Sequence, residues 1–318
     1  MIKGDIPSLS KSITLIESKL DSDRALAEFL IEKTLPYSGN SFRLGITGVP
    51  GVGKSTFIES LGLHLLSKGK KVAVLAVDPS SEISRGSILG DKSRMEKLSV
   101  RPGVFIRPTP SGGYLGGVAR RTHETILLCE VAGFDFIIVE TVGVGQSETA
   151  VQHLTDFFLL LMLAGSGDEL QGIKRGIMEM ADSILITKSD GQNINASKLA
   201  KAEFSRALHY FAAGESGWIP RVDVCSALTN AGIEEFYNTL IEFERNQKIN
   251  NFFGNRRTQQ NIYWFESSLS NSLLEIISVS PEIGSLVTKM KKNISDNLIS
   301  PHLAINTIIT EIKKIFVR

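Results

Sequence analysis

The most constraining feature of this chain is the stretch Gly48-Val-Pro-Gly-Val-Gly-Lys-Ser55, which fits G-x-x-x-x-G-K-[S/T], the phosphate-binding loop (P-loop). It follows an apolar run, Phe42–Thr47, and opens a helical pattern, Ser55–Leu66. In that context, small residues let backbone N–H groups surround a phosphate chain, and the helix adds its positive N-terminal end. We expect Lys54 to neutralise phosphate oxygens and Ser55 to bind Mg²⁺. The positions expected to surround the nucleotide phosphates are Gly48, Val49, Pro50, Gly51, Val52, Gly53, Lys54, Ser55 and Thr56.

Composition narrows the possible partners and compartments. The 318 residues include 35 Lys and Arg and 34 Asp and Glu. This balance leaves no excess of positive charge to attract nucleic acid or an anionic membrane. Cys129 and Cys225 are isolated in apolar runs, a pattern of buried residues in a reducing compartment. Met1–Ser10 lacks a signal-peptide pattern, and the longest apolar run, Phe157–Ala164, is too short to cross a bilayer. We therefore expect a soluble cytoplasmic protein with no nucleic-acid or membrane partner.

The chain divides into three predicted regions: a helical arm (1–38), a nucleotide-binding domain (39–246) and a helical tail (247–318). In the middle region, apolar strands alternate with helices, which is typical of an α/β fold with a parallel sheet flanked by helices. The predicted strands are Phe42–Thr47, Lys71–Val77, Val104–Ile106, Phe134–Val139, Phe157–Leu163, Ser183–Thr187 and Val222–Cys225. Polar Asn246–Asn261 breaks the pattern, and the predicted tail helices are Ile262–Val279, Pro281–Met290 and Pro301–Phe316.

Two predicted strands are followed by a carboxylate, Asp78 and Glu140. Ligands of open α/β sheets bind beyond the carboxyl ends of the strands, so either side chain could hold Mg²⁺ directly or through water. Glu140-Thr-Val-Gly143 also has the spacing of the D-x-x-G element of GTPases, whose glycine N–H faces the γ-phosphate. The alternative for each carboxylate is a solvated residue or a helix cap.

The sequence Thr187-Lys-Ser-Asp190 follows an apolar run and resembles the N-K-x-D element that selects guanine, with Thr in place of Asn. In that element, Asp accepts from guanine N1 and N2, and the Lys stem covers the base. Adenine would leave the carboxylate unpaired, which is costly in a buried site. The downstream residues Ser226, Ala227 and Leu228 resemble the loop that donates to guanine O6, although a plain turn would also explain them.

Five further segments, in order along the chain, resemble the MeaB/ArgK family. They are Val77-Asp-Pro-Ser-Ser81, Leu89-Gly-Asp-Lys-Ser-Arg-Met95, Leu115-Gly-Gly-Val118, Val139-Glu-Thr-Val-Gly-Val-Gly-Gln-Ser-Glu148 and Gly167-Asp-Glu-Leu-Gln-Gly-Ile-Lys174. This family contains GTPase chaperones of adenosylcobalamin-dependent methylmalonyl-CoA mutase, and older names call its members lysine/arginine/ornithine transport-system kinases. The resemblance covers nearly the whole chain. It implies a P-loop GTPase of the SIMIBI class that uses GTP/GDP and Mg²⁺, and a homodimer joined largely through C-terminal helices.

By position, the resemblance implies an acidic cluster around the metal made of Asp78, Asp91 and Glu140, with Lys188 and Asp190 on guanine. Asp91 carries no signal of its own, because a solvated loop carboxylate is the default. The resemblance also implies that Gly167–Lys174 couples nucleotide state to partner binding. For the water-positioning group, Asp78 is the first candidate and Gln146 the second.

We expect a Mg²⁺-dependent GTPase that guards a cobalamin-dependent mutase, with slow intrinsic turnover. Three alternatives stay open: a kinase or ATPase linked to amino-acid transport, a metallochaperone GTPase, and a GTP-switched adaptor. Two lone cysteines and scattered histidines argue against the metallochaperone. Two apolar stripes support the homodimer, although both could instead pack on their own domain. The stripes are Ile262, Phe265, Leu269, Leu273, Ile276 and Ile277, and Leu303, Ile305, Ile308, Ile309, Ile312, Ile315 and Phe316.

Overall fold

The computed structural model describes residues 2, 4–18, 20–78, 94–110, 115–141, 148–165, 175–209 and 216–316. The chain divides into two compact units, residues 1–261 and 262–318, and each is described by itself. In the described part of the chain, no helix combines the length and the apolar character that a bilayer crossing requires.

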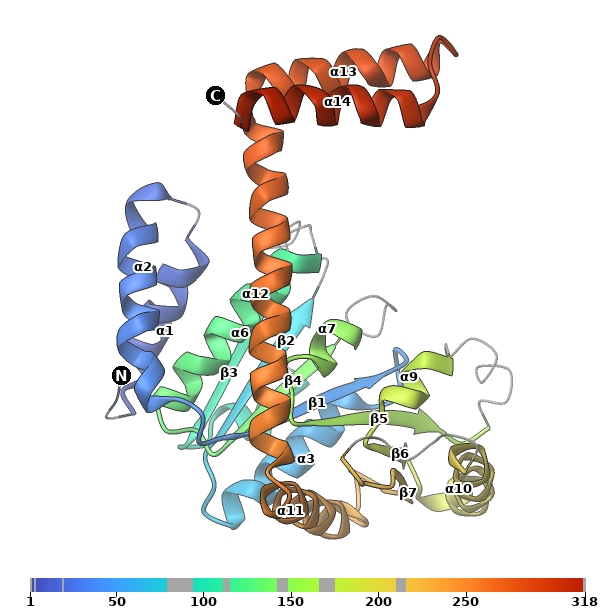
Figure 1. Ribbon diagram of the computed structural model, residues 1–318. Helices are drawn as coiled ribbons and strands as arrows, with labels where there is room; N and C mark the ends of the chain where they lie inside the picture. Colours follow the sequence, from blue (N-terminus) through green and yellow to red (C-terminus); the bar gives the residue numbers. More distant parts are fainter. Residues whose placement is uncertain are drawn as a thin grey trace. The chain divides into compact units, whose positions relative to one another are not determined.

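The first unit is built on a seven-stranded parallel sheet with the strand order β3-β2-β4-β1-β5-β6-β7 (Figure 1). The strands are β1 (Phe42–Gly48), β2 (Val72–Asp78), β3 (Val104–Pro110), β4 (Phe136–Thr141), β5 (Phe157–Leu163), β6 (Ser183–Thr187) and β7 (Arg221–Val224). The central strand β1 is buried along its whole length and pairs through Leu44 with Ile138 of β4 and Phe157 of β5. Such continuous apolar runs are what a sheet covered on both faces requires. The predicted α/β fold is confirmed.

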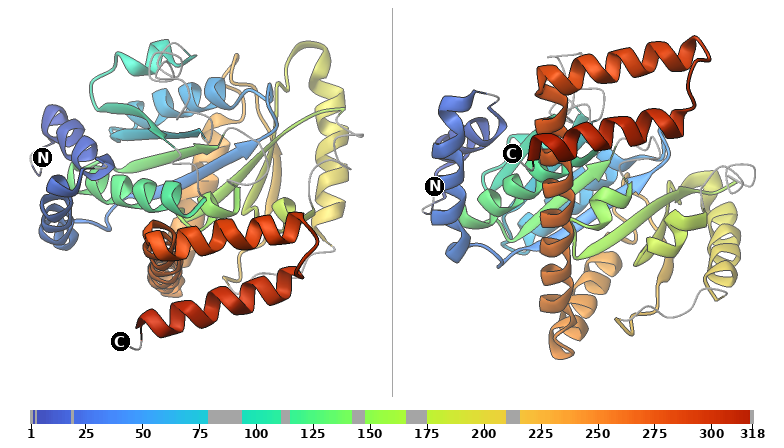
Figure 2. Two further views of the ribbon diagram at one scale, coloured as in Figure 1. Left: turned by 90° about the horizontal axis from the view of Figure 1, so that it is seen from above. Right: turned by 45° about the horizontal axis from the view of Figure 1, so that its top comes forward.

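Helices cover both faces of this sheet (Figures 1 and 2). One face carries α3 (Lys54–Ser67) and α11 (Ile233–Ile249), with the short α5 (Glu96–Ser99) packed on α3. The opposite face carries α6 (Leu115–Val131), α7 (Glu148–Gln152) and α9 (Arg175–Met180), and α10 (Ile194–Leu208) packs on β6 and β7. Two short 3-10 helices, η1 (Leu35–Tyr37) and η2 (Gly191–Asn193), complete the connections.

Aromatic side chains dominate the core beneath α3 and α11. The ring of Phe243 lies edge-on to Phe157 at 4.9 Å and to Trp218 at 5.1 Å. Phe157 and Phe243 are almost completely buried, and burying each such ring stabilises the fold by about 1.5–3 kcal/mol. This packing fixes α11 against the start of β5.

The N-terminal arm consists of α1 (Ile6–Glu17) and α2 (Asp21–Thr34), which pack on α6. The Asp5 carboxylate caps α1 by accepting a hydrogen bond of 2.9 Å from the Ser8 N–H, which satisfies one of the free donors at the helix start. Leu9, Ile13 and Ile16 form its buried face, at the steps of three and four residues that an amphipathic helix requires.

The predicted break at Asn246–Asn261 is wrong, because α11 continues to Ile249 and α12 (Phe252–Val279) begins only three residues later. The polar residues that suggested a break make long-range contacts from the first turns of α12. Arg257 binds the Asp156 carboxylate at 2.6 Å, Arg256 lies 3.5 Å from Asp182, and the Gln260 amide donates to the Thr155 carbonyl at 2.8 Å. Sequence periodicity cannot distinguish such bound polar side chains from a solvated linker.

Other boundaries shift by a few residues. Strand β3 runs four residues past its predicted end and includes Pro108 and Pro110, which an edge strand tolerates. Strand β4 runs to Thr141, so Glu140 lies within the strand and not after it.

The second unit contains the end of α12 together with α13 (Pro281–Ser295) and α14 (Pro301–Phe316). The Ser280 hydroxyl accepts from the Ile283 N–H at 3.5 Å and caps α13, and α13 continues past its predicted end. Ile283, Met290 and Ala304 are the buried residues of this helical pair.

Candidate nucleotide-binding site

The P-loop joins the carboxyl end of β1 to α3, in the strand–loop–helix arrangement that the motif requires. Gly48 lies so close to β5 that a Cβ there would sit 2.7 Å from the Leu161 carbonyl oxygen. Gly53 has a φ of 101° and starts α3, whose first hydrogen bond runs from the Phe57 N–H to the Gly53 carbonyl at 2.9 Å. Both positions therefore favour glycine.

Lys54 is 9% exposed and folds back over the loop. Its ammonium group donates to the Gly48 carbonyl at 2.7 Å and to the Val49 carbonyl at 3.3 Å. Burial lowers the pKa of Lys54 from its ordinary value, and Arg94 acts in the same direction, whereas Glu140 and Glu148 oppose the shift. A partly desolvated ammonium held by neutral carbonyls keeps a positive charge to offer an anion at the mouth of the loop.

Oxygen groups suited to a hard cation lie beside Lys54. The Ser55 hydroxyl, at the start of α3, donates to the Glu140 carboxylate on β4 at 3.4 Å. Behind them, the buried Thr141 and Thr47 hydroxyls bond to each other at 2.9 Å and hold β4 against β1. Hydroxyl and carboxylate oxygens are the ligands that Mg²⁺ prefers, so Ser55 and Glu140 fit a site with few protein ligands. Among the described residues, no group of three or more His, Cys, Asp and Glu side chains could hold a metal by itself.

The end of β6 is fastened to the P-loop by two hydrogen bonds. The buried Thr187 hydroxyl donates to the Val52 carbonyl at 2.6 Å, and the Lys188 ammonium donates to the Gly51 carbonyl at 2.8 Å. Lys188 has a φ of 55°, an unusual backbone conformation for a residue with a side chain and one that concentrates at functional sites. Thr187, which departs from the usual Asn, thus joins the segment predicted to select the base to the P-loop.

Asp190 lies at the same end of the sheet and is oriented by the loop after β7. The Ser226 hydroxyl donates to the Asp190 carboxylate at 2.5 Å, and the Ser226 N–H is itself bonded to the Ala231 carbonyl at 2.9 Å. One oxygen of Asp190 is fixed in this way, and the carboxylate can still accept from a base. Of the two residues after Ser226, Leu228 is exposed.

The fold brings most of the predicted site residues to the carboxyl edge of the sheet. Asp78 is the last residue of β2, and β4, which carries Glu140, lies between β2 and β1. Asp91, Gly143, Gln146 and Gly167–Lys174 lie outside the described residues.

Sequence reasoning missed contributions from four residues. It gave no role to the Thr187 hydroxyl, it placed Lys188 against the base without its bond to Gly51, and it did not single out Arg94 or Glu148. The motif match could have drawn attention to Thr187 and Lys188, because both lie within it. No local signal relates Arg94 to Lys54, because the relation depends on how α5 packs on α3.

These features define the class of the protein, a P-loop nucleotide hydrolase with a parallel α/β sheet. The family model described as methylmalonyl Co-A mutase-associated GTPase MeaB matches residues 9–282. The chain belongs to this family, and it is a GTPase.

Individual relatives support the same family membership. GTPase ArgK of Escherichia coli is 43% identical over 299 residues, covering 94% of this chain and 90% of that protein. The mouse methylmalonic aciduria type A homolog, a mitochondrial protein, is 41% identical over 323 residues, covering 98% of this chain and 78% of that protein. The crystal structure of a LAO/AO transport system kinase superposes with a TM-score of 0.78 at 36% identity, covering 98% of this chain and 95% of that one.

Proposed function

We propose that this GTPase is a chaperone of an adenosylcobalamin-dependent methylmalonyl-CoA mutase. In this proposal, GTP binding and hydrolysis are coupled to loading of the cofactor and protection of the mutase. The observation that carries the proposal is the family match over residues 9–282, whose description names association with that mutase. The name of the mouse relative, which refers to methylmalonic aciduria, supports the same metabolic setting.

Within the site, we assign three groups of residues to three parts of the ligand. The phosphates lie in Gly48–Thr56, with Gly143 near the γ-phosphate. The base is held by Lys188 and Asp190, with help from the loop Ser226–Leu228. The residues assigned to Mg²⁺ are Ser55, Asp78, Asp91 and Glu140. When bound, the metal supplies positive charge to the phosphate oxygens.

The chain's own contribution to hydrolysis is to position the γ-phosphate and offset its charge. Lys54 and the P-loop N–H groups would do so from one side. Glu140→Ala should bind GDP within about threefold of the unmodified protein, while single-turnover GTP hydrolysis falls about 10²-fold, the usual scale for losing one stabilising group. Normal hydrolysis by this variant would move the metal-binding role to Asp78.

The partner can be tested directly with a purified methylmalonyl-CoA mutase. Gel filtration should show a complex, and the rate of adenosylcobalamin loading should differ between GDP and a non-hydrolysable GTP analogue. Lys54→Ala is the control, because it should abolish the nucleotide dependence. No complex and no change in loading with any nucleotide would contradict the chaperone proposal.

A second candidate, a transport-linked kinase, is favoured by the name of the relative of known structure, a LAO/AO transport system kinase. It predicts transfer of the γ-phosphoryl group to a protein or small-molecule acceptor, whereas a GTPase releases inorganic phosphate. A third, a GTP-switched adaptor, predicts that Glu140→Ala keeps full function in loading despite its lost hydrolysis.

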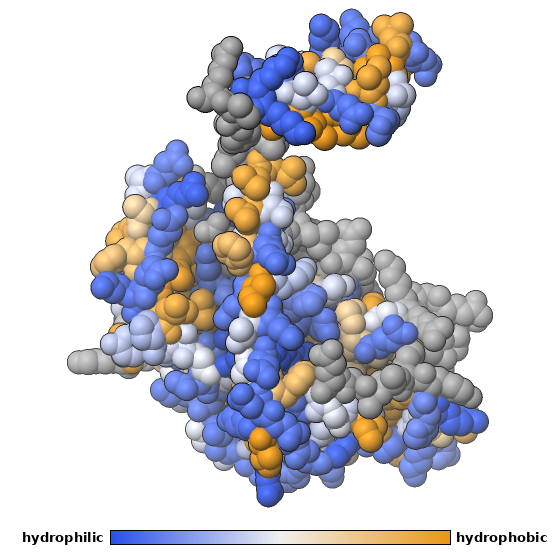
Figure 3. All heavy atoms as spheres, viewed as in Figure 1, coloured by the Kyte–Doolittle hydropathy of each residue, from blue (hydrophilic) through white to orange (hydrophobic). Residues whose placement is uncertain are grey.

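We also propose a homodimer built from the C-terminal helices, supported by the apolar surface of the second unit. Phe265, Leu269 and Leu273 recur on α12 at steps of four residues and are 66%, 48% and 46% exposed. Leu303, Ile305 and Ile309 of α14 are also exposed. Figure 3 shows apolar residues gathered along α12. A surface of this kind favours association. Sedimentation of the full-length chain as a monomer at micromolar concentration would refute the proposal, and the double change Phe265→Glu with Leu269→Glu should convert a dimer into a monomer.

A further inference from the structure

The loop that follows β7, residues 226–232, is a compact turn. The Ser226 N–H donates to the Ala231 carbonyl at 2.9 Å and closes the loop on itself. A Cβ on Gly232 would lie 2.4 Å from the Val224 carbonyl oxygen, so glycine permits the chain to turn back closely on the end of β7. These contacts give the loop a defined shape.

One side chain of this loop reaches the helix that follows the P-loop. The Ser60 hydroxyl of α3 donates to the Oδ1 atom of Asn230 at 2.6 Å, and the two residues are 170 positions apart in sequence. Ser60 is 7% exposed, whereas Asn230 is exposed. Asn230 has a φ of 61°, a left-handed conformation that asparagine adopts more readily than most residues. Asn230 therefore serves both the turn and its attachment to α3.

The helix that leaves the loop, α11, packs on the same helix α3. The ring of Phe236 on α11 lies edge-on to the ring of Phe57 on α3, with centroids 5.6 Å apart, and both side chains are buried. Ser60 lies one turn after Phe57 along α3. Apolar contacts are not directional, so they fix the separation of the two helices, whereas the Ser60 hydrogen bond also fixes the orientation of the loop.

The same loop holds the side chain assigned to the base. The Ser226 hydroxyl donates to the Asp190 carboxylate at 2.5 Å, and the Ser226 N–H is bonded to Ala231, the neighbour of Asn230. A continuous path of hydrogen bonds and adjacent residues therefore runs from Ser60 on α3 to the Asp190 carboxylate.

The base site is thus fastened from two sides. On the β6 side, Thr187 and Lys188 donate to carbonyls of the P-loop itself. On the β7 side, the Ser60 hydrogen bond reaches the loop from α3. Because the P-loop and the start of α3 would hold the phosphates, these attachments set the position of the base contacts relative to the phosphates.

We propose that Ser60 and Asn230 are positioning residues for the selection of guanine. Their hydrogen bond fixes the loop after β7 to α3, so that the loop and the Asp190 carboxylate meet the base in one geometry. Polar contacts discriminate between ligands best when they are held in place before the ligand arrives. The inference rests on the proposed base site at Asp190, which Asp190→Asn tests separately.

The alternative is that the Ser60 bond only helps to pack α11 on α3. The two roles differ in their effect on a nucleotide with another base. Loss of packing would disturb the P-loop helix and weaken GDP and ADP alike. Loss of positioning would weaken GDP alone, because adenine does not offer Asp190 the two donors that guanine does.

Displacement of a fluorescent GDP by unlabelled GDP or ADP measures both affinities. Ser60→Ala should weaken GDP binding about fivefold (~1 kcal/mol), the scale of one neutral hydrogen bond, while ADP binding stays within about twofold. The matched control is Ser67→Ala on the same helix, because the Ser67 hydroxyl donates to the His64 carbonyl at 2.7 Å and not to the loop. This control should change neither affinity.

Variants of Asn230 separate the backbone conformation from the hydrogen bond. Asn230→Gly keeps the left-handed conformation without the acceptor and should reproduce the fivefold loss of GDP affinity. Asn230→Asp keeps an oxygen acceptor and should retain most of the affinity. Ser60→Ala combined with Asn230→Gly should lose no more than either change alone, because both remove the same bond.

The inference is overturned if Ser60→Ala changes the preference for GDP over ADP by less than twofold, or if the losses of the two single variants add in the double variant. If Asp190→Asn alters base preference and Ser60→Ala does not, the positioning role fails and the base site stands. If the unmodified protein binds GDP and ADP equally, both fail.

Discussion

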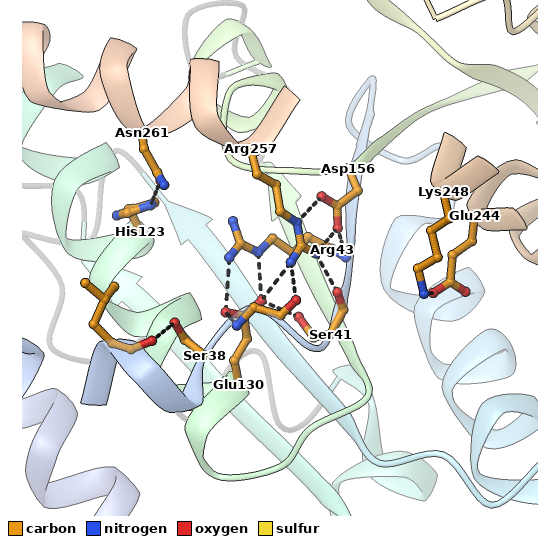
Figure 4. Close-up of polar contacts among 12 residues, drawn as sticks. Ser38, Ser41, Arg43, His123, Glu130, Asp156, Glu244, Lys248, Arg257 and Asn261 are labelled. Atoms are coloured by element: carbon orange, nitrogen blue, oxygen red, sulfur yellow. Dashed lines mark hydrogen bonds and ion pairs between the residues drawn. The ribbon is translucent and has the colours of Figure 1, made fainter. Parts of the chain in front are cut away.

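The two edges of the sheet are both rich in polar groups, but the positively charged side chains have different partners at each edge. At the carboxyl edge, the hydrogen bonds of Lys54 and Lys188 in the described residues go to backbone carbonyls. At the amino edge, arginines and carboxylates neutralise each other in a closed network (Figure 4). Neutral carbonyls leave the positive charge of a cation available to a ligand. A carboxylate neutralises that charge, and the resulting ion pair contributes to the stability of the fold.

The amino-edge network is built from four charged residues on different elements. Arg43 on β1 binds Glu130 of α6 through two bonds of 2.9 and 3.0 Å. Arg257 of α12 binds both oxygens of Asp156 and donates to the carbonyls of residues 39 and 41. Burial alone would raise the pKa of Glu130, but the charge and hydrogen bonds of Arg43 hold this pKa below its ordinary value. We therefore interpret the network as a structural anchor for the start of α12.

The largest expected effect is on stability at the amino edge. Arg257→Met should lower the free energy of unfolding by about 3–5 kcal/mol, because it leaves the buried Asp156 charge without its partner. Urea unfolding measures the change, and Arg257→Met with Asp156→Asn should recover part of it. The GDP affinity of the folded variant should stay within about threefold, and a much larger loss would break the distinction between the two edges.

The next effect concerns binding at the carboxyl edge. Lys54→Ala should weaken GDP binding by about 10²-fold, the scale of a lost charge-assisted contact of about 3 kcal/mol. The stability of the ligand-free protein should not fall, because removing a partly desolvated ammonium removes a burial cost. Fluorescent-nucleotide titration and thermal unfolding measure the two quantities, with the exposed Lys198→Ala as control. Strong destabilisation by Lys54→Ala would mean that its charge serves the fold.

A smaller effect tests base selection at the same edge. Asp190→Asn should shift preference from guanine to xanthine nucleotides by about 10-fold, since a bidentate contact discriminates by about 1–3 kcal/mol. The amide can donate where the carboxylate accepted. The comparison is the ratio of GDP to XDP affinities, and Thr187→Ser, which keeps the hydroxyl, is the control. Equal turnover of ATP and GTP by the unmodified protein would contradict the guanine assignment.

The smallest effect is a pH dependence at the amino edge. The Nε2 atom of His123 lies 3.2 Å from the Asn261 Oδ1, which accepts a hydrogen bond from it, and burial, together with the nearby Arg43 charge, lowers the pKa of His123 to about 4. The folded state disfavours protonation, so this contribution to stability is complete above about pH 6.5 and declines as the pH falls toward 4. The full shift corresponds to about 3 kcal/mol, and the partial exposure of the ring reduces it to about 1–2 kcal/mol. The free energy of unfolding, measured at about pH 6.5 and about pH 4, should fall more in the unmodified protein than in His123→Gln. Equal losses in the two proteins would refute this.

Local patterns in the sequence were sufficient to locate the parallel sheet and the contiguous motifs at its carboxyl edge. The alternation of apolar runs and helices predicts the parallel sheet, because buried strands and amphipathic helices carry different periodicities. Gly48–Ser55 and Thr187–Asp190 are contiguous, so their residue types and their places after strands could be recognised without knowing any distant contact. The chemical roles assigned to these residues remain predictions that the variants above test.

Only the tertiary structure revealed the contacts between segments that are distant in sequence. It showed that α12 begins within the polar run before Asn261, where Arg257 and Gln260 bind the two residues that precede β5, about one hundred residues away in sequence. It also packed α5 against α3 through Glu59 and Leu98, and it joined Thr187 to Val52. A sequence specifies which groups can donate, accept or carry charge, but the packing of distant segments decides which partner each group meets and whether its charge remains available to a ligand.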